Sequence, residues 1–144
     1  MKRLFLLAAL AAACDKKEEK PAPAADGPAK VKVRHILIGW SGAPRSQSTR
    51  SFAEAEKKAK DLLERAKNGD DFEHMMKKES EDPGGGTYTM VNRGQTAAPG
   101  EQTRDGMVKG FGDAAFRMKV GEIVLVPYDP QSSPFGWHII SRLE

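Results

Sequence analysis

The chain has 144 residues, of which 23 are lysine or arginine and 20 are aspartate or glutamate, and its formal net charge at pH 7 is +3. Loss of Lys2 and Arg3 with the signal peptide predicted below takes the basic count from 23 to 21, which leaves a net charge of about +1. This balance gives no reason to expect a nucleic-acid-binding protein or a polybasic membrane patch, and the length suits one domain with a single core.

Residues 1–13 have the three parts of a secretory signal peptide. A basic start at Lys2 and Arg3 is followed by the apolar run 4–10 and by three alanines at 11–13. The apolar run is too short to span a bilayer as a helix. We therefore predict that residues 1–13 are a signal peptide and that the mature chain is exported.

Cys14 is the only cysteine in the chain, so no intramolecular disulfide forms. It directly follows the three alanines, and this placement resembles the lipobox of bacterial lipoproteins, whose cysteine is the site of cleavage and acylation, although Ala11 stands where the lipobox usually has leucine. The resemblance implies lipidation at Cys14 and a location in the cell envelope, anchored by lipid to a bacterial membrane and facing the periplasm or the exterior. The alternative is an ordinary secretory signal followed by an incidental thiol.

Residues 14–30 are predicted to be a disordered tether. After Cys14 the sequence DKKEEKPAPAADGPAK mixes charges with proline and alanine, and it holds no apolar side chain larger than alanine. Such a segment buries too little apolar surface to offset the entropy cost of ordering it. It would span roughly 20 to 25 Å as a flexible coil and up to about 50 Å when extended.

The folded domain is expected over residues 31–144, and it opens with a strand over 31–38. Apolar side chains alternate with Lys32 and Arg34 before the run becomes continuously apolar, which is typical of a half-buried strand. His35 shares the face of the apolar set.

Three helices are predicted next. SFAEAEKKAKDLLERAKNG opens with a capping box from Ser51 to Glu54 and ends at Gly69. Its apolar stripe is made of Phe52, Ala55, Ala59, Leu62, Leu63 and Ala66. A second, shorter helix has Asp70 as N-cap and Glu73 closing the box. Its buried side chains are predicted to be Phe72, Met75 and Met76.

The third helix covers GDAAFRMK, residues 112–119, and ends at Gly121. Two further strands are predicted in EIVLVP, residues 122–127, and FGWHIISRL, residues 135–143. The expected fold class is therefore α+β, with a small antiparallel sheet of about four strands and three to four helices packed around it.

Two histidines lie inside apolar strands, His35 in VRHILI and His138 in GWHII. A buried imidazole needs hydrogen-bond partners, and the two can supply each other if the first and last strands are neighbours. A metal site is the alternative, but neither histidine has a second ligand at a close spacing, and two ligands do not make a zinc site. We expect no metal and no cofactor. His74 lies among charged residues and is read as a solvated side chain.

Five segments resemble, in chain order, the parvulin family of peptidyl-prolyl cis-trans isomerases. They are VRHILI, FAEAEKKAKDLLERAKNGDDFEHM, ESEDPGGG, MVKGFGDAAFRMKVGEI and FGWHII, and together they extend over nearly all of residues 31–144. The resemblance implies that His35, Asp82 and His138 are the catalytic residues. It implies that the proline-binding residues are Met107, Phe111, Tyr88 and Phe135. Without it, Met107 and Phe111 would be read as ordinary core, and Asp82 equally as the acceptor of an Asx turn before Pro83.

Three features depart from the family pattern or leave alternatives open. In Thr87-Tyr88-Thr89, tyrosine replaces a pocket leucine and Thr89 replaces a glycine that can adopt positive φ. Residues 95–106 have the composition of an inserted surface loop and are a candidate flap over the substrate groove. Arg45 and Arg50 lie in a loop that, by the resemblance, flanks the site, where they either favour an acidic residue before proline or are simply solvated.

The sequence thus predicts a monomeric, lipid-anchored prolyl isomerase that acts on proline-containing segments of unfolded or exported polypeptides. One alternative is a non-catalytic chaperone or peptide-binding module with the same fold, which the altered segment Thr87-Tyr88-Thr89 favours. A metal-binding lipoprotein that uses His35 and His138 is the other alternative, and the missing ligands argue against it.

Overall fold

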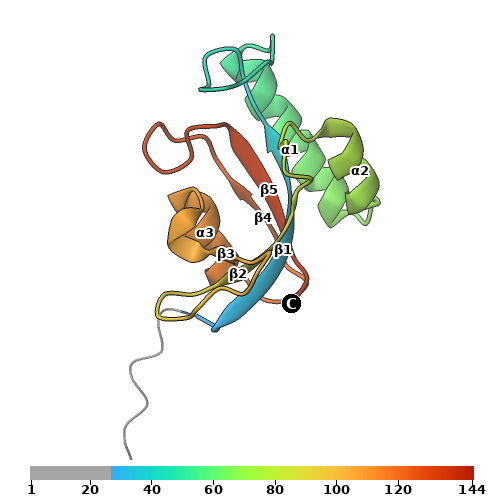
Figure 1. Ribbon diagram of the computed structural model, residues 1–144. Helices are drawn as coiled ribbons and strands as arrows, with labels where there is room; N and C mark the ends of the chain where they lie inside the picture. The colour runs from blue at the N-terminus through green and yellow to red at the C-terminus, as the bar shows by residue number, and fades with distance from the viewer. Residues whose placement is uncertain (1–26) are drawn as a thin grey trace, which may run out of the picture.

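The computed structural model describes residues 27–144, so the predicted signal peptide, Cys14 and the tether up to residue 26 lie outside the described residues. The elements are β1 (Lys30–Ile38), α1 (Phe52–Lys67), α2 (Phe72–Glu79), β2 (Thr87–Val91), β3 (Gln102–Thr103), the 3-10 turn η1 (Arg104–Gly106), α3 (Lys109–Arg117), β4 (Ile123–Val126) and β5 (Trp137–Arg142) (Figure 1). Within residues 27–144 we find no helix with the length and apolarity needed to cross a membrane.

The five strands form one sheet in the order β3-β2-β1-β5-β4, with β1 at its centre. β1 pairs antiparallel with both β2 and β5, so the first and last strands are neighbours, as predicted. The α+β fold class is confirmed. The sheet is mixed rather than antiparallel, because β3 pairs parallel with β2. β3 has two residues, which is too short to produce an alternating pattern in the sequence.

Helices cover both faces of the sheet (Figure 1). On β1, Ile36 and Ile38 pack in a cluster with the buried sides of α1 and α2, whereas Val31 and Val33 pack with Phe111 and other residues of α3 on the opposite face. Alternate residues of a strand point to opposite faces, which explains this division. His35 therefore shares the α3 face with Val31 and Val33.

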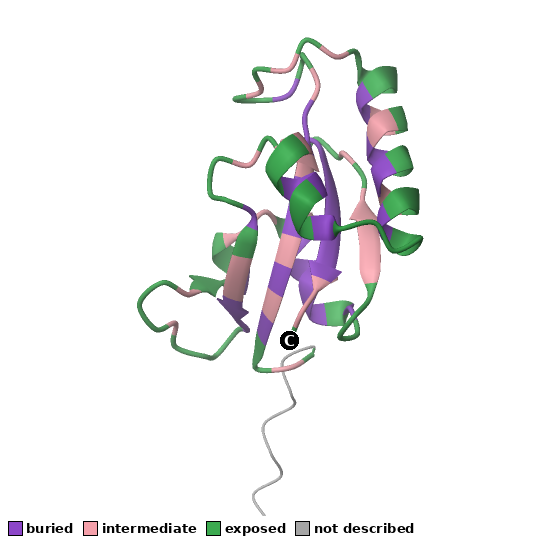
Figure 2. Cartoon of the chain, turned by 90° about the vertical axis from the view of Figure 1, so that its right-hand side faces the viewer, coloured by how far each residue is buried: buried purple, intermediate pink, exposed green. Residues whose placement is uncertain are grey.

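α1 has the predicted capping box, since the Ser51 hydroxyl accepts a hydrogen bond from the Glu54 backbone N–H and the Glu54 carboxylate accepts one from the Ser51 N–H. Its inner side is buried against the sheet and its outer side is exposed (Figure 2). Phe52 departs from the predicted stripe, because it is 42% exposed at the first turn. It contacts the rings of Trp40 and Trp137 edge-on.

The N-cap of α2 is Asp71 and not Asp70, so the prediction was wrong by one residue. The Asp71 carboxylate accepts a hydrogen bond from the His74 N–H at 3.1 Å, while Asp70 pairs with Arg65 of α1 at 2.8 Å. The predicted box with Glu73 does not form, because the third helical residue is His74. Phe72, Met75 and Met76 are buried, as predicted.

α3 begins at Lys109, before the predicted start at residue 112, and ends at Arg117. Glycines at 110 and 112 have low helix propensity, but both fill places where the backbone of another segment is close. A Cβ added at Gly110 would lie 2.9 Å from the Ser132 carbonyl oxygen, and one at Gly112 would lie 2.9 Å from the Arg104 carbonyl oxygen.

Candidate functional site

The two strand histidines meet in the interior. The register places His138 of β5 opposite Leu37 and His35 of β1 opposite Ile140, which makes the imidazoles diagonal neighbours. Their Nδ1 atoms are 3.1 Å apart and the rings are stacked, with side chains that are almost completely buried. The predicted hydrogen bond between them is confirmed.

Asp82 is held over His35 by the segment that follows α2. The Glu81 N–H donates to the Leu37 carbonyl at 2.9 Å, and the Leu37 N–H donates to the Ser80 hydroxyl at 3.0 Å, so this segment runs beside β1. The Asp82 Oδ2 atom then lies 2.6 Å from His35 Nε2.

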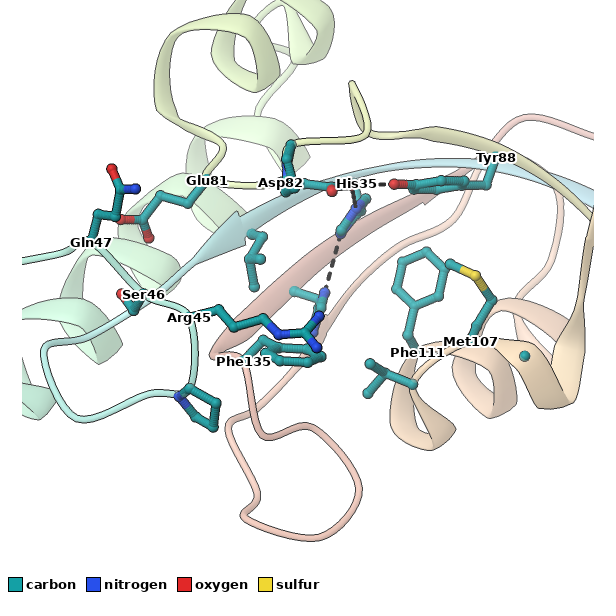
Figure 3. Close-up of a pocket in the computed structure, with 16 residues that line it drawn as sticks. His35, Arg45, Ser46, Gln47, Glu81, Asp82, Tyr88, Met107, Phe111 and Phe135 are labelled. Carbon is teal, nitrogen blue, oxygen red and sulfur yellow. Dashed lines mark hydrogen bonds and ion pairs between the residues drawn. The ribbon is translucent and has the colours of Figure 1, made fainter. Parts of the chain in front are cut away.

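The other carboxylate oxygen of Asp82 accepts a hydrogen bond from the Gly84 N–H at 2.9 Å. Asp82 is therefore both the acceptor of a turn, as one reading of the sequence predicted, and a hydrogen-bond partner of His35. The Tyr88 hydroxyl donates to Asp82 Oδ2 at 2.6 Å, the atom that also contacts His35 (Figure 3). With the bond between the two imidazoles, Tyr88, Asp82, His35 and His138 form one network.

The network fixes the tautomers when both imidazoles are neutral. An ionised Asp82 only accepts, so His35 carries its proton on Nε2 and offers the Nδ1 lone pair. His138 then donates from Nδ1. Its Nε2 atom is buried and has no hydrogen-bond partner within the described part of the chain.

Burial and hydrogen bonding set the protonation states. Burial opposes ionisation of Asp82, but hydrogen bonds from His35, Tyr88 and Gly84 outweigh it and hold the pKa of the carboxyl well below its usual range. Burial, and then the Asp82 carboxylate, raise the pKa of the Tyr88 hydroxyl, so it remains a donor. Burial, and then His35, lower the pKa of His138 to about 3.

A cavity of about 730 Å³ opens above this network (Figure 3). Met107, Val108 and Phe111 form an apolar wall at the start of α3, and the Phe111 ring contacts the His35 ring edge-on at 4.7 Å between centroids. Phe135 lies on the β5 side, and the rim is polar. All the predicted catalytic and proline-binding residues line the cavity: His35, Asp82, Tyr88, Met107, Phe111, Phe135 and His138.

Of the two arginines considered in the sequence, only Arg45 lines the cavity. Its guanidinium lies 5.9 Å from the centre of the Phe135 ring, and its backbone adopts a φ of 60°, which is unusual outside glycine. Arg50 pairs with Glu81 at 3.4 Å instead. The rim residues Ser46, Gln47 and Glu81 were not predicted, because loop conformation brings them there and no sequence pattern reports it.

The altered segment and the inserted loop fit the fold in ways that the sequence did not predict. Thr89 lies in β2 opposite Lys32, so a glycine with positive φ is not needed there, and the turn uses Gly85 and Gly86 for that purpose. Residues 95–106 do not form a flap, since Gly106 alone of them lines the cavity.

Arg104 explains why the inserted segment stays away from the cavity. Its buried side chain donates to the Asp113 carboxylate of α3 at 2.9 Å and to the Asn92 side-chain oxygen at 3.1 Å. These bonds fix the segment to the far side of α3. In residues 27–144, no three His, Cys, Asp or Glu side chains are gathered so that they could hold a metal ion.

Residues 19–144 match a protein family described as the PPIC-type PPIase domain. The chain is 35% identical to the foldase protein PrsA 4 of Bacillus cereus over 101 residues, which cover 67% of this chain and 31% of that protein. It is 35% identical to the chaperone SurA of Nitrosospira multiformis over 118 residues, covering 80% of this chain and 22% of that protein.

Among solved structures, the peptidyl-prolyl isomerase ESS1 of Candida albicans superposes with a TM-score of 0.60 and 25% sequence identity, covering 81% of this chain and 63% of that one. The chain spans less than a third of the length of the two curated relatives.

Proposed function

This chain belongs to the PPIC-type, or parvulin-type, family of peptidyl-prolyl isomerase domains, and from that premise we propose that it catalyses cis-trans rotation about X-Pro bonds. One observation carries the proposal, namely an apolar cavity whose floor is the hydrogen-bonded set Asp82, His35 and His138.

The reaction requires no bond to break. The barrier to rotation, roughly 18 to 20 kcal/mol, comes from amide resonance. Lowering it by about 4 kcal/mol shortens a relaxation time of tens of seconds to tens of milliseconds. A binding site that favours the twisted amide by this modest amount is sufficient.

The cavity offers two means of favouring the twisted amide. Met107 and Phe111 provide an adaptable side chain and a flat face against which a pyrrolidine ring can rest, and they exclude water from the neighbouring carbonyl. The planar amide places partial negative charge on its carbonyl oxygen. An ionised Asp82 in the cavity floor disfavours that charge and hence the planar form. The histidines then orient Asp82 and are not the groups that exchange protons.

The proposed substrates are proline-containing segments of unfolded or exported polypeptides, and the proposed location is the cell envelope, with a lipid anchor at Cys14. The signal-like start of the chain supports this location. The names foldase and chaperone given to the relatives support a folding role. Arg45 at the rim supports a preference for an acidic residue before proline, because the charge of Arg50 is already paired with Glu81.

The test is an isomerisation assay on short peptides that differ only in the residue before proline. We expect catalysis, and a higher kcat/KM for glutamate than for lysine at that position. Peptide binding without any acceleration would support the alternative, a non-catalytic chaperone with the same fold.

Phe111→Ala tests the site, with Phe116→Ala as the matched control. Both side chains are buried on α3, but only Phe111 lines the cavity, and each truncation is expected to cost about 3 to 5 kcal/mol of stability. Turnover is compared on folded protein at low temperature. If folded Phe111→Ala kept the activity of Phe116→Ala, the proposed proline site would be misplaced.

A further inference from the structure

The Tyr88 hydroxyl is aimed at Asp82 and not at the open cavity. It donates to Asp82 Oδ2 at 2.6 Å, the same atom that receives the hydrogen bond from His35 Nε2 at 2.6 Å (Figure 3). Since the Gly84 N–H donates to the other oxygen, the carboxylate is held by groups from three directions. A residue that served only as an apolar wall would not need the hydroxyl.

The surroundings of Tyr88 accommodate the hydroxyl specifically. A Cβ added at Gly84 would overlap the hydroxyl oxygen and would lie 3.3 Å from the ring carbon that carries it, so glycine at this turn leaves the space that the phenol occupies. The ring stands on β2 opposite Val33, with its centroid 5.7 Å from that of His35 and 6.2 Å from that of Phe111. Strand pairing and ring contacts therefore fix the position of the oxygen.

We propose that Tyr88 is a positioning residue of the isomerase site, whose hydroxyl fixes the Asp82 carboxylate in place against His35. This inference rests on the proposed isomerase activity. Tyr88 acts through Asp82, and its ring still contributes to the cavity wall.

Loss of the hydroxyl weakens the hold on the carboxylate in two ways. One of the two donors to Oδ2 disappears, so the ionised form is less favoured and the carboxylate is freer to rotate. The titratable and charged groups that face Asp82 or share its cavity are His35 from β1, Tyr88 from β2, His138 from β5, and Glu81 and Arg45 at the rim. His35 cannot replace the lost donor, because its Nε2 is already bonded to the same oxygen.

Tyr88→Phe tests the inference, because it keeps the ring and removes only the oxygen. Tyr128→Phe is the matched control: Tyr128 is the other of the two tyrosines, it lies among Trp40, Phe52 and Trp137, and it does not line the cavity. The first readout is the titration of the Asp82 side-chain carboxyl, followed by carbon-13 NMR. Its midpoint should move to higher pH in Tyr88→Phe and stay unchanged in Tyr128→Phe.

The second readout is kinetic. We expect kcat/KM of Tyr88→Phe to fall about tenfold, the size of effect that follows from losing one hydrogen bond to a charged group. The acid limb of its pH profile should lie at higher pH than in the wild type, because a carboxyl with a higher pKa loses its charge earlier as the pH falls. A purely structural defect would lower activity without moving that limb.

Several outcomes would overturn the inference. An Asp82 titration that is the same in Tyr88→Phe and the wild type would do so, whatever the activity. Wild-type kcat/KM in Tyr88→Phe, combined with a loss in Tyr88→Leu, would show that the ring acts only as a wall. If the wild type did not accelerate isomerisation, the proposed function would fail, while the NMR titration would still decide whether Tyr88 holds Asp82.

Gly84→Ala provides a second variant if Tyr88→Phe does not fold. The added methyl group would overlap the Tyr88 hydroxyl oxygen, which must then shift, whereas its 3.4 Å contact with Asp82 Oδ1 is an ordinary one. The Asp82 titration should again move to higher pH, and an unmoved midpoint would count against the proposal.

Discussion

Each polar side chain in the floor of the cavity depends on its neighbour for a hydrogen bond. His138 is the end of this network, since its Nδ1 bonds to His35 and its Nε2 has no partner among residues 27–144. Because ionised Asp82 only accepts, the proton of His35 is on Nε2 and that of His138 is on Nδ1, so the unpaired Nε2 of neutral His138 is an acceptor and not an N–H donor. The arrangement in which His138 donates from Nδ1 is therefore the one that we expect.

Single and double replacement of the histidines tests their mutual dependence. His35→Ala or His138→Ala leaves the partner buried with a lost hydrogen bond, at about 1 to 3 kcal/mol each. The double variant should lose less stability than the sum of the two singles, because the second change removes a group that has already lost its partner. Unfolding free energies from urea titrations measure the difference, and strictly additive losses would show that the imidazoles do not depend on each other.

The low pKa of His138 predicts a pH-dependent stability. In the unfolded chain this histidine has its ordinary pKa of 6.5, whereas in the folded chain its pKa is lowered to about 3. The unfolded state therefore binds more protons between these values. The contribution of His138 to stability is complete above about pH 6.5 and is lost as the pH falls below it, by at most about 1.4 kcal/mol per pH unit.

Urea unfolding at pH 7.5, 6.5 and 5.5 measures this effect. The decline in stability towards pH 5.5 should be smaller in His138→Gln than in the wild type. His74→Gln is the control, since His74 is exposed on α2, and it should keep the wild-type slope. An unchanged slope in His138→Gln would mean that another group carries the dependence.

At the scale of single residues, the histidine pair could be predicted because each histidine lies in an apolar run and strand periodicity sets its face. The hydrogen bond between Tyr88 and Asp82 could not be predicted from the sequence. It depends on the turn at residues 83–86, where Gly85 and Gly86 adopt φ values of 83° and 88°. Nothing in the sequence gives the direction in which such a turn leaves the sheet.

At the scale of elements, local signals located the helices better than their ends. The box at Ser51 was found because its two residues are separated by three positions and flank an apolar stripe. The N-cap of α2 was misassigned because two aspartates are adjacent and either can cap. The Asp70 carboxylate accepts a hydrogen bond from the Arg65 side chain of α1. This contact leaves Asp71 as the N-cap of α2.

Replacement of each aspartate separates the two roles. Asp71→Ala removes the cap of α2 and should lower the unfolding free energy by about 0.5 to 2 kcal/mol. Asp70→Ala removes an exposed ion pair and should cost about 0 to 1 kcal/mol. Urea unfolding of the two variants under identical conditions makes the comparison. A larger loss in Asp70→Ala would contradict the capping geometry.

At the scale of the whole molecule, the cavity is assembled from segments that are far apart in the chain. β1 and β5 supply its floor, the segment after α2 supplies Asp82, and the start of α3 supplies its wall. The order of strands and helices could be read from sequence periodicity. The positions of β3 and of the segment around Arg104 could not be predicted in this way. A two-residue strand has no periodicity, and the buried ion pair between Arg104 and Asp113 is a tertiary contact.

The direction of β1 also relates the cavity to the membrane anchor that we propose. The described chain begins at Gly27, just before β1, whereas His35, Leu37 and the loop at 44–47 line the cavity near the other end of that strand. The nine residues of β1 span about 30 Å. The cavity is thus lined by the middle of β1 and by its end at Ile38, whereas the proposed tether joins the domain before the opposite end of that strand.

Acylation of Cys14 is the last prediction, and its test separates location from catalysis. Metabolic labelling with a radioactive fatty acid should mark the wild type and leave Cys14→Ser unlabelled, because the chain has no other thiol. The unlabelled variant should isomerise short peptides at the wild-type rate, since the cavity is built from residues 35–138 and a small peptide reaches it equally well in solution. Cys14→Ser also removes the predicted cleavage site, so the apolar run 4–10 stays attached to the variant, and the fatty-acid label rather than the membrane fraction reports acylation. A wild type that is unlabelled and free in the envelope would contradict the anchor and leave the assignment of the cavity unaffected.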